Sequence, residues 1–537
     1  MPICFLEAGL SVAARALLTG AAQHENIGTF LSASSARRLA SAAARPSKAK
    51  GIDAMSIDRR RLLKLAGLAS LAGVAPHLAR GANASASPRA DHTLRIANGL
   101  VELSPDHIVS TTLYNGQFPG PLLRFKEGER VSVDVYNDTD TPELVHWHGQ
   151  MIPSEVDGAA EEGTPYIAPH GMRRISFVPK PAGFRFYHTH VTVGSDLNRG
   201  TYTGLAGPVY IEPKNNRGAY DREVFLVMKE FVPAFSRGGD MANDALAGAP
   251  IKALMDMGKA ADEEATERTK GYEVGYELFS INGHMLAHGD PIRVKQGERV
   301  LFHVLNASAT EIRSLALPGH RFKIVALDGN PVPMPAEVPV LWLGTAERVS
   351  AIVEMTHPGV WVMGDLSDDD RGNGMGIVIE YAGASGEPQW LKPPAYKWDY
   401  TLFGKADAAA KPDETIEITV VKHNGALGGF NQWTLNGEAF SMAKMRPLYT
   451  VHEGRRYRLK VRNGSDDIHP LHLHRHSFEL TSIGGKPTSG VLKDVVMMGG
   501  FQEVEFDFVA DNPGLTLFHC HQQLHMDFGF MALFKYV

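Results

Sequence analysis

Four short histidine clusters contain the residues whose types and spacing could do chemistry. In a β-strand, residues i and i+2 share a face, so a His-x-His pair directs two imidazoles at one point, as metal coordination requires. One such pair is more often a surface or hydrogen-bonded pair, but ten histidines and one cysteine in four clusters predict metal sites. The clusters are His146-Trp147-His148-Gly149, His188-Thr189-His190, His469-Pro470-Leu471-His472-Leu473-His474, and His519-Cys520-His521 followed by His525.

The ligand types restrict the metal. One thiolate with two imidazoles is the ligand set of a blue-copper site, whereas clusters made only of imidazole suit copper or zinc. The chain has two cysteines, which excludes a structural zinc site with four cysteine ligands. We expect Cys4 to be absent from the mature protein, which leaves Cys520 without a disulfide partner, either as a bystander or as a special thiolate.

A weak internal repeat indicates the elements that must position these clusters. Each copy has an Asn-Gly pair, then a glycine, and then an asparagine nine residues after that glycine. Between the last two, apolar residues such as Val131, Val133 and Val135 alternate with residues that face the other way, which predicts half-buried strands. The copies are Asn115-Gly116, Gly128 and Asn137; Asn282-Gly283, Gly297 and Asn306; and Asn436-Gly437, Gly454 and Asn463.

Short strands separated by Gly- and Pro-rich turns, without evident long amphipathic helices, predict an all-β fold. A chain of 537 residues is too long for one core. We therefore expect three β-sandwich domains of Greek-key type, over 87–215, 216–390 and 391–537. An Ala-, Gly- and acid-rich stretch over about 236–270 is expected to be an insertion or long loop.

The segment before these domains has the order of an export signal. Asp58-Arg59-Arg60-Arg61-Leu62-Leu63-Lys64 resembles a twin-arginine motif, and an apolar run and small residues near Ala84 follow it. We expect a twin-arginine signal peptide over 55–86 and a periplasmic or exported protein. Because Met55 lies just before the motif, residues 1–54 are expected to be a non-native or disordered extension.

Charge argues against nucleic acid and anionic membranes as partners. Residues 1–86 carry 11 of the 54 Lys and Arg but only 4 of the 60 Asp and Glu, so the remaining chain is clearly acidic. We expect a small-molecule or metal-ion partner and no stable membrane insertion.

In order and position, the four clusters resemble the copper-binding motifs of the multicopper oxidases. The resemblance covers the chain from about residue 95 to the C-terminus. It implies three cupredoxin-like domains and four copper ions per chain. By motif position, the type 1 (blue) copper would take His469, Cys520 and His525, and the type 2 copper His146 and His472. The type 3 pair would take His148, His188, His190, His474, His519 and His521.

The middle copy has no copper motif. His320-Arg321-Phe322 aligns roughly with His476-Ser477-Phe478, which puts Ala316 and Pro318 where the third copy has two of its ligands. We expect both aligned histidines to be structural and the middle domain to be a spacer that has no copper.

The resemblance also implies roles beside the copper ligands. The axial position of the type 1 site falls at Phe530, which cannot coordinate, so we expect a three-coordinate copper of rather high potential; Met531 is the alternative after a one-residue shift. Asp157 matches an acid near the trinuclear cluster, with a plain turn residue as the alternative. Met526 stands where many bacterial relatives have a second relay acid. Asp494 is expected near the type 1 site, to steer substrate or as a structural residue.

The function implied is that of a laccase-like enzyme. It would oxidise phenols or aromatic amines at the type 1 copper and reduce O2 to water at the other three. Cys520 would connect the two, because its neighbours His519 and His521 bind the type 3 pair. A metal oxidase acting on Cu(I), Mn(II) or Fe(II) and a non-catalytic periplasmic copper-binding protein are the alternatives, whereas a copper nitrite reductase would lack the doubled His-x-His set. One chain can complete the cluster, so we expect a monomer.

Overall fold

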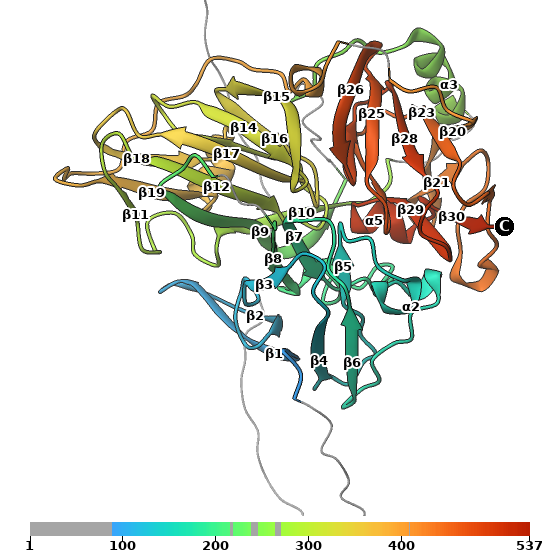
Figure 1. Ribbon diagram of the computed structural model, residues 1–537, viewed down its shortest axis with the longest axis horizontal. Coiled ribbons are helices and arrows are strands. Elements are labelled where there is room, and N and C mark those ends of the chain that lie inside the picture. The colour runs from blue at the N-terminus through green and yellow to red at the C-terminus, as the bar shows by residue number, and fades with distance from the viewer. Residues whose placement is uncertain (1–88, 215–217, 238–244, 264–269, 407–408) are drawn as a thin grey trace, which may run out of the picture. The chain divides into compact units, whose positions relative to one another are not determined.

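The computed structural model describes residues 89–214, 218–237, 245–263, 270–406 and 409–537, and this part of the chain is mainly β-strand (Figure 1). Its strands form six sheets, two in each predicted domain, so the all-β prediction of three Greek-key sandwiches is confirmed. The predicted signal peptide and N-terminal extension lie outside the described residues. The exact domain boundaries stay predictions.

The first domain has two four-stranded sheets. Their orders are β2-β1-β4-β6 and β3-β8-β7-β5, and the predicted strand with Val131, Val133 and Val135 buried is β4. The strands are β1 (His92–Ser104), β2 (His107–Tyr114), β3 (Leu123–Lys126), β4 (Val131–Asn137), β5 (His146–His148), β6 (Met172–Phe177), β7 (Gly183–His188) and β8 (Ala206–Glu212).

The middle domain has a six-stranded and a five-stranded sheet. Their orders are β10-β9-β12-β17-β14-β15 and β11-β19-β18-β13-β16. The strands are β9 (Arg222–Ser236), β10 (Glu273–Ile281), β11 (Ile292–Val294), β12 (Arg299–Asn306), β13 (Arg313–Ala316), β14 (Phe322–Leu327), β15 (Asn330–Val338), β16 (Val340–Leu343), β17 (Arg348–Glu354), β18 (Val360–Gly364) and β19 (Gly376–Tyr381).

The third domain repeats this plan strand for strand. Its sheets have the orders β21-β20-β23-β28-β25-β26 and β22-β30-β29-β24-β27. The strands are β20 (Glu414–Leu427), β21 (Phe430–Leu435), β22 (Tyr449–Val451), β23 (Arg456–Asn463), β24 (His469–Leu473), β25 (Phe478–Ile483), β26 (Lys486–Lys493), β27 (Val495–Met498), β28 (Glu503–Val509), β29 (Leu515–Cys520) and β30 (Met531–Tyr536).

The repeated Asn-Gly pairs form the same turn in all three domains. Asn115, Asn282 and Asn436 have φ of 53°, 55° and 52°, and the glycine after each also has positive φ, as hairpin turns of this type require. Each asparagine side chain is hydrogen-bonded to the backbone of a neighbouring strand; Oδ1 of Asn282, for example, accepts from Val227 N at 2.8 Å. The sequence repeat is therefore a structural repeat.

His320 and His476, the two aligned histidines that are not predicted copper ligands, occupy equivalent positions, as their alignment predicts. Nδ1 of His320 lies 2.7 Å from the carbonyl of Pro318 and its Nε2 lies 2.5 Å from Tyr381 Oη. Nδ1 of His476 lies 2.9 Å from the carbonyl of His474, and its Nε2 lies 2.6 Å from the hydroxyl of Tyr536. Because both ring nitrogens are engaged in each case, a structural role fits both histidines.

Among the described residues, helices are short and lie between strands. The 236–270 stretch contains α3 (Lys252–Glu263), which lies against β20 of the third domain, so part of the predicted long loop is a helix. Its Lys, Leu, Met and Ala residues are good helix formers. The others are α2 (Ser154–Asp157), α4 (Asp368–Gly372), α5 (Gln523–Asp527) and the 3-10 turns η1 (Ala160–Glu162), η2 (Gly200–Tyr202), η4 (Tyr400–Phe403) and η5 (Met442–Lys444). Within the described residues, no helix has the length and apolar character that spanning a membrane needs.

Candidate metal centre

The strands that carry the histidine motifs pair in register within the first and third domains. β5 pairs with β7, with His146 opposite His188, and β24 pairs with β29, with His472 opposite His519. These strands and the residues that follow them bring eight buried histidines together, which we call the histidine cluster. Its members are His146, His148, His188, His190, His472, His474, His519 and His521.

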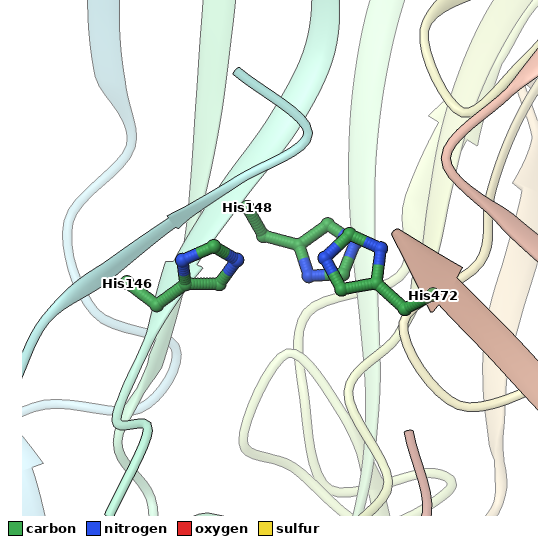
Figure 2. Close-up of side chains that lie close together, drawn as sticks. All are labelled: His146, His148 and His472. Carbon is green, nitrogen blue, oxygen red and sulfur yellow. The ribbon is translucent and has the colours of Figure 1, made fainter. Parts of the chain in front are cut away.

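The candidate ligand atoms of the histidine cluster form three all-histidine groups, each with its atoms within 4.8 Å of one another. Figure 2 shows the first group, in which imidazoles from β5 and β24 meet. The rings of His148 and His472 are stacked with centroids 3.9 Å apart, and Nε2 of His474 lies 3.0 Å from Nε2 of His519. The groups are His146, His148 and His472; His148, His188 and His521; and His190, His474 and His519.

A separate cysteine group consists of His469, Cys520 and His525, all buried. Sγ of Cys520 lies 3.6 Å from Nδ1 of His469 and 3.7 Å from Nδ1 of His525. Strand alternation explains how neighbouring residues serve different centres, because Cys520 points to the opposite side of β29 from His519. The end of one strand therefore supplies both groups.

Backbone carbonyls orient four rings of the histidine cluster. A carbonyl oxygen only accepts, so the Nδ1 that faces it carries the proton and Nε2 presents a lone pair. The Nδ1–carbonyl pairs are His146–Asp157 (2.9 Å), His188–Thr189 (2.6 Å), His472–Asp494 (2.7 Å) and His519–Cys520 (2.8 Å).

Several buried ring nitrogens of the histidine cluster have no hydrogen-bond partner among the described residues. These are Nε2 of His146 and His472 and both ring nitrogens of His190 and His521. Burial lowers the pKa of His190, His472 and His521 well below its usual value, so these rings are neutral and their lone pairs are free. Unpaired buried polar atoms are unfavourable, and metal ions would satisfy them.

Three sequence models of the multicopper oxidase family match the chain, over residues 97–216, 256–382 and 412–537. This chain belongs to the multicopper oxidase family. It is 29% identical over 440 residues to multicopper oxidase MmcO of Mycobacterium tuberculosis, covering 80% of this chain and 84% of that one. It is 24% identical over 549 residues to laccase-3 of Thanatephorus cucumeris, covering 83% and 90%. The crystal structure of Fet3p, a multicopper oxidase that functions in iron import, has the same fold, with a TM-score of 0.66 at 17% identity over 83% of this chain and 90% of that one.

Membership of the multicopper oxidases confirms the predicted cupredoxin-like fold and the predicted enzyme class, an oxidoreductase that uses O2. It also implies copper, and the donors fit that metal. One thiolate with two imidazoles suits blue copper, and the all-imidazole groups suit copper as well. All eleven predicted ligand residues lie in one or more of the groups described above. The number of ions and the assignment of each ligand stay predictions.

Asp157 lies against the histidine cluster and is fully buried. Its Oδ2 is 2.9 Å from Nδ1 of His474 and 3.0 Å from Nδ1 of His146. These contacts favour a role beside the oxygen site over that of a plain turn residue, and that role stays a prediction.

Glu161 and Glu162 are carboxyls of the site that sequence reasoning missed. Oε2 of Glu161 lies 3.7 Å from Nδ1 of His190, and burial raises the pKa of Glu161 to about 7. Glu162 accepts a hydrogen bond from Leu517 N at 2.7 Å, and burial, followed by the charge of Asp157, raises its pKa well above the usual value. Two adjacent glutamates near glycines are typical of an exposed turn. The one sequence feature that could have indicated their role is that they follow Asp157 closely in the chain.

Asp494 does not lie where it could steer a substrate. It is fully buried, its Oδ1 is 3.1 Å from Nε2 of His148, and the guanidinium of Arg348 contacts both of its oxygens. The expectation of a substrate-steering residue is wrong for this reason, and the structural alternative fits.

Phe530 faces the cysteine group. Its ring centroid lies 4.8 Å from that of His469, and it is fully buried. Met531 pairs across the sheet with His519 and packs with Leu517 and Met526 in a different cluster. The geometry therefore favours Phe530 over Met531 at the axial position.

Glu273 is a third residue that the sequence motifs did not indicate. It begins β10 of the middle domain, and its Oε2 lies 3.7 Å from Nε2 of His525. Its side chain is 21% exposed, and Asn431 Nδ2 donates to its other oxygen at 2.8 Å. Since Nδ1 of His525 faces Cys520, the opposite edge of that buried ring faces the partly exposed Glu273.

Proposed function

We propose that this protein is a laccase-like multicopper oxidase that binds four copper ions per chain. The cysteine group would hold the type 1 copper, and the histidine cluster would hold the type 2 copper through His146 and His472 and the type 3 pair through its other six members. The bound ions would supply one-electron redox chemistry, by which a reductant is oxidised at the first site and O2 is reduced to water at the others.

The arrangement around Cys520 is the observation that carries this proposal. Its Sγ faces His469 and His525, whereas His519 and His521, on either side of it, belong to two different groups of the histidine cluster. Adjacent residues of one chain segment therefore join the two centres, which suits electron transfer between them. A copper-binding protein without turnover would not require this connection.

Residues of this chain have definable tasks in such a reaction. The carboxylate of Glu273 would accept a hydrogen bond from a phenol or an aromatic amine beside His525. Asp157, beside His474, and Glu161, beside His190, would pass protons toward the histidine cluster. The cluster is assembled from two domains of one chain, which supports a monomer.

A metal oxidase is the second candidate, because the carboxylate of Glu273 also suits a metal cation. Glu273 would also attract a cation such as Cu(I), Mn(II) or Fe(II) toward the Nε2 edge of His525. Fet3p, which shares the fold, functions in iron import.

We further propose that the protein is exported through the twin-arginine route, on the motif at Arg59-Arg60.

Copper-loaded activity tests these proposals. The full chain would be loaded with copper, its visible spectrum recorded, and O2 consumption followed with a methoxyphenol and with Cu(I), Mn(II) or Fe(II). An intense blue band, with phenol-driven O2 uptake that Cys520→Ser abolishes, is the expected result. Uptake with metal ions alone would move the protein to the metal oxidases. A blue protein that consumes no O2 with any donor would overturn the enzymatic proposal.

A further inference from the structure

The middle domain reaches the histidine cluster through a buried ionic network. Six charged side chains, three basic and three acidic, are each at most 2% exposed and come from all three domains. They link in a chain of ion pairs at 2.6 to 3.7 Å. The members of this network are Arg185, Asp328, Glu347, Arg348, Lys493 and Asp494.

Arg348 and Asp494 form the part of the network nearest the predicted ligands. Nη1 and Nη2 of Arg348, the first residue of β17, each donate to a different carboxylate oxygen of Asp494 at 2.6 Å. Oδ1 of Asp494 in turn lies 3.1 Å from Nε2 of His148. The side chain of Asp494 therefore connects Arg348 of the middle domain to His148, a predicted type 3 ligand.

His148 is oriented differently from the rings that backbone carbonyls hold. Its Nε2, not its Nδ1, faces a hydrogen-bond acceptor, and that acceptor is a side chain. Its Nδ1 lies 3.4 Å from Nε2 of His188, on the side of the candidate ligand group. The carboxylate of Asp494 therefore keeps the proton on Nε2 and leaves the lone pair of Nδ1 directed inward.

The middle domain also fixes the backbone of Asp494. Oδ2 of Asp328 accepts from the amides of Asp494 at 3.2 Å and Val495 at 3.1 Å. The carbonyl of Asp494 is the group that holds Nδ1 of His472. One residue of the third domain therefore orients a predicted type 2 ligand through its backbone and a predicted type 3 ligand through its side chain.

Gly149, directly after His148, shows how tightly this network is packed. Its φ is +77°, and a Cβ at this position would lie 2.6 Å from Oδ2 of Asp494 and 2.7 Å from Nη2 of Arg348. A side chain here would displace the ion pair, so the glycine of the His-Trp-His-Gly motif leaves the space that the pair needs.

We propose that Arg348 is a positioning residue of the oxygen-reducing centre, which holds Asp494 against His148 and so sets the coordinating nitrogen of that ring. The inference rests on the proposed function, since it takes the histidine cluster to bind copper. Removing the arginine would leave a buried carboxylate without its main partner, which is strongly unfavourable, so the side chain of Asp494 would move. That movement withdraws the acceptor from Nε2 of His148. The middle domain, predicted as a spacer, then takes part in assembling the site.

Arg348→Met and a matched control, Arg313→Met, test this role in the copper-loaded full chain. Arg313 is also a buried arginine of the middle domain, 1% exposed, but it pairs with Asp370 at 2.5 Å and contacts no predicted ligand. The readouts are copper per chain by elemental analysis, blue absorbance per chain, the paramagnetic resonance of the type 2 copper, and O2 uptake. We expect Arg348→Met to keep the blue absorbance and to lose copper or alter the type 2 resonance, with O2 uptake about 10- to 100-fold lower. Arg313→Met should match the wild type in all four.

Two results would overturn the proposal. One is Arg348→Met with wild-type copper content, resonance and uptake, and the other is an equal loss of every signal in both variants, which would show general destabilisation. If Arg348→Met does not fold, the same comparison is made with Arg348→Lys, which keeps the charge but cannot donate from two nitrogens in a fixed plane. A wild-type chain that binds no copper would instead refute the proposed function, so the two failures are distinguishable.

Discussion

The ring of Phe530 lies 4.8 Å, centroid to centroid, from the imidazole of His469, in the position that the family resemblance assigns to the axial ligand of the type 1 copper. The indole of Trp433 packs 4.7 Å from His469 and 4.4 Å from His525. The cysteine group therefore lies among aromatic rings, and the side chain of Phe530 has no atom that could act as a fourth donor.

Replacing Phe530 with methionine should lower the reduction potential of the type 1 copper. A thioether at this position would be a weak axial ligand and would favour Cu(II) relative to the wild type. Because the volumes are similar, the free energy of unfolding should change by less than about 1.5 kcal/mol. A redox titration of the blue band measures the effect. Met531→Leu, which changes a side chain in the other cluster, is the control, and an unchanged potential in Phe530→Met would contradict the axial assignment.

Glu273→Gln should weaken the binding of the reductant more than it slows turnover. A carboxylate accepts a stronger hydrogen bond than an amide, so KM for a phenol should rise by about three- to tenfold, and KM for a metal cation should rise more. Steady-state O2 uptake with both donors measures this. Glu277→Gln serves as the control, since Glu277 is an exposed residue on the same strand. Equal KM values in Glu273→Gln and the wild type would show that substrates approach elsewhere.

Removing copper should destabilise the folded protein. Without copper, the buried imidazoles keep unpaired nitrogens. With copper at a free concentration of 100 times its Kd, each bound ion contributes about 2.7 kcal/mol to the free energy of unfolding. Urea unfolding of the chelated and reloaded protein measures the difference, with Mg²⁺ as a control because it prefers oxygen ligands. Identical unfolding midpoints with and without copper would argue against metal sites in the described groups.

His303→Phe should make the protein less sensitive to acid. Burial lowers the pKa of His303 to about 4, below its usual value of 6.5, so between these values the unfolded chain binds the proton and the folded chain does not. Above pH 6.5 the residue is neutral in both states, so its protonation does not lower the free energy of unfolding. As the pH drops from 6.5 to 4, protonation of the unfolded chain lowers the free energy of unfolding by roughly 3 kcal/mol at most. Phenylalanine suits the site, because His303 already stacks on Phe225 with centroids 4.7 Å apart.

Urea unfolding at pH 7.5 and pH 5 measures this difference for His303→Phe and the wild type. The exposed His288, changed to glutamine, provides the control. If His303→Phe and the wild type lose the same stability on acidification, the histidine is not held neutral in the fold.

Much of the fold was determined by the sequence because its signals are local. The Asn-Gly pairs dictate positive-φ hairpin turns whatever surrounds them, and the alternation around Val133 dictates a strand with one buried face. The His-x-His spacing likewise dictates that His146 and His148 share a side of β5. Because these are properties of a few adjacent residues, three sandwiches and a copper site could be predicted from one sequence.

Only the tertiary structure decided which distant groups meet. Asp494 and Arg348 are 146 residues apart and Asp494 and His148 are 346 apart, and no spacing in the chain records that they form one hydrogen-bonded line. Glu273 and Glu161 were missed, and Asp494 was misplaced, for the same reason. The role of a charged side chain depends on whether the fold buries it and on which charge it meets there, and both are set by how the domains pack.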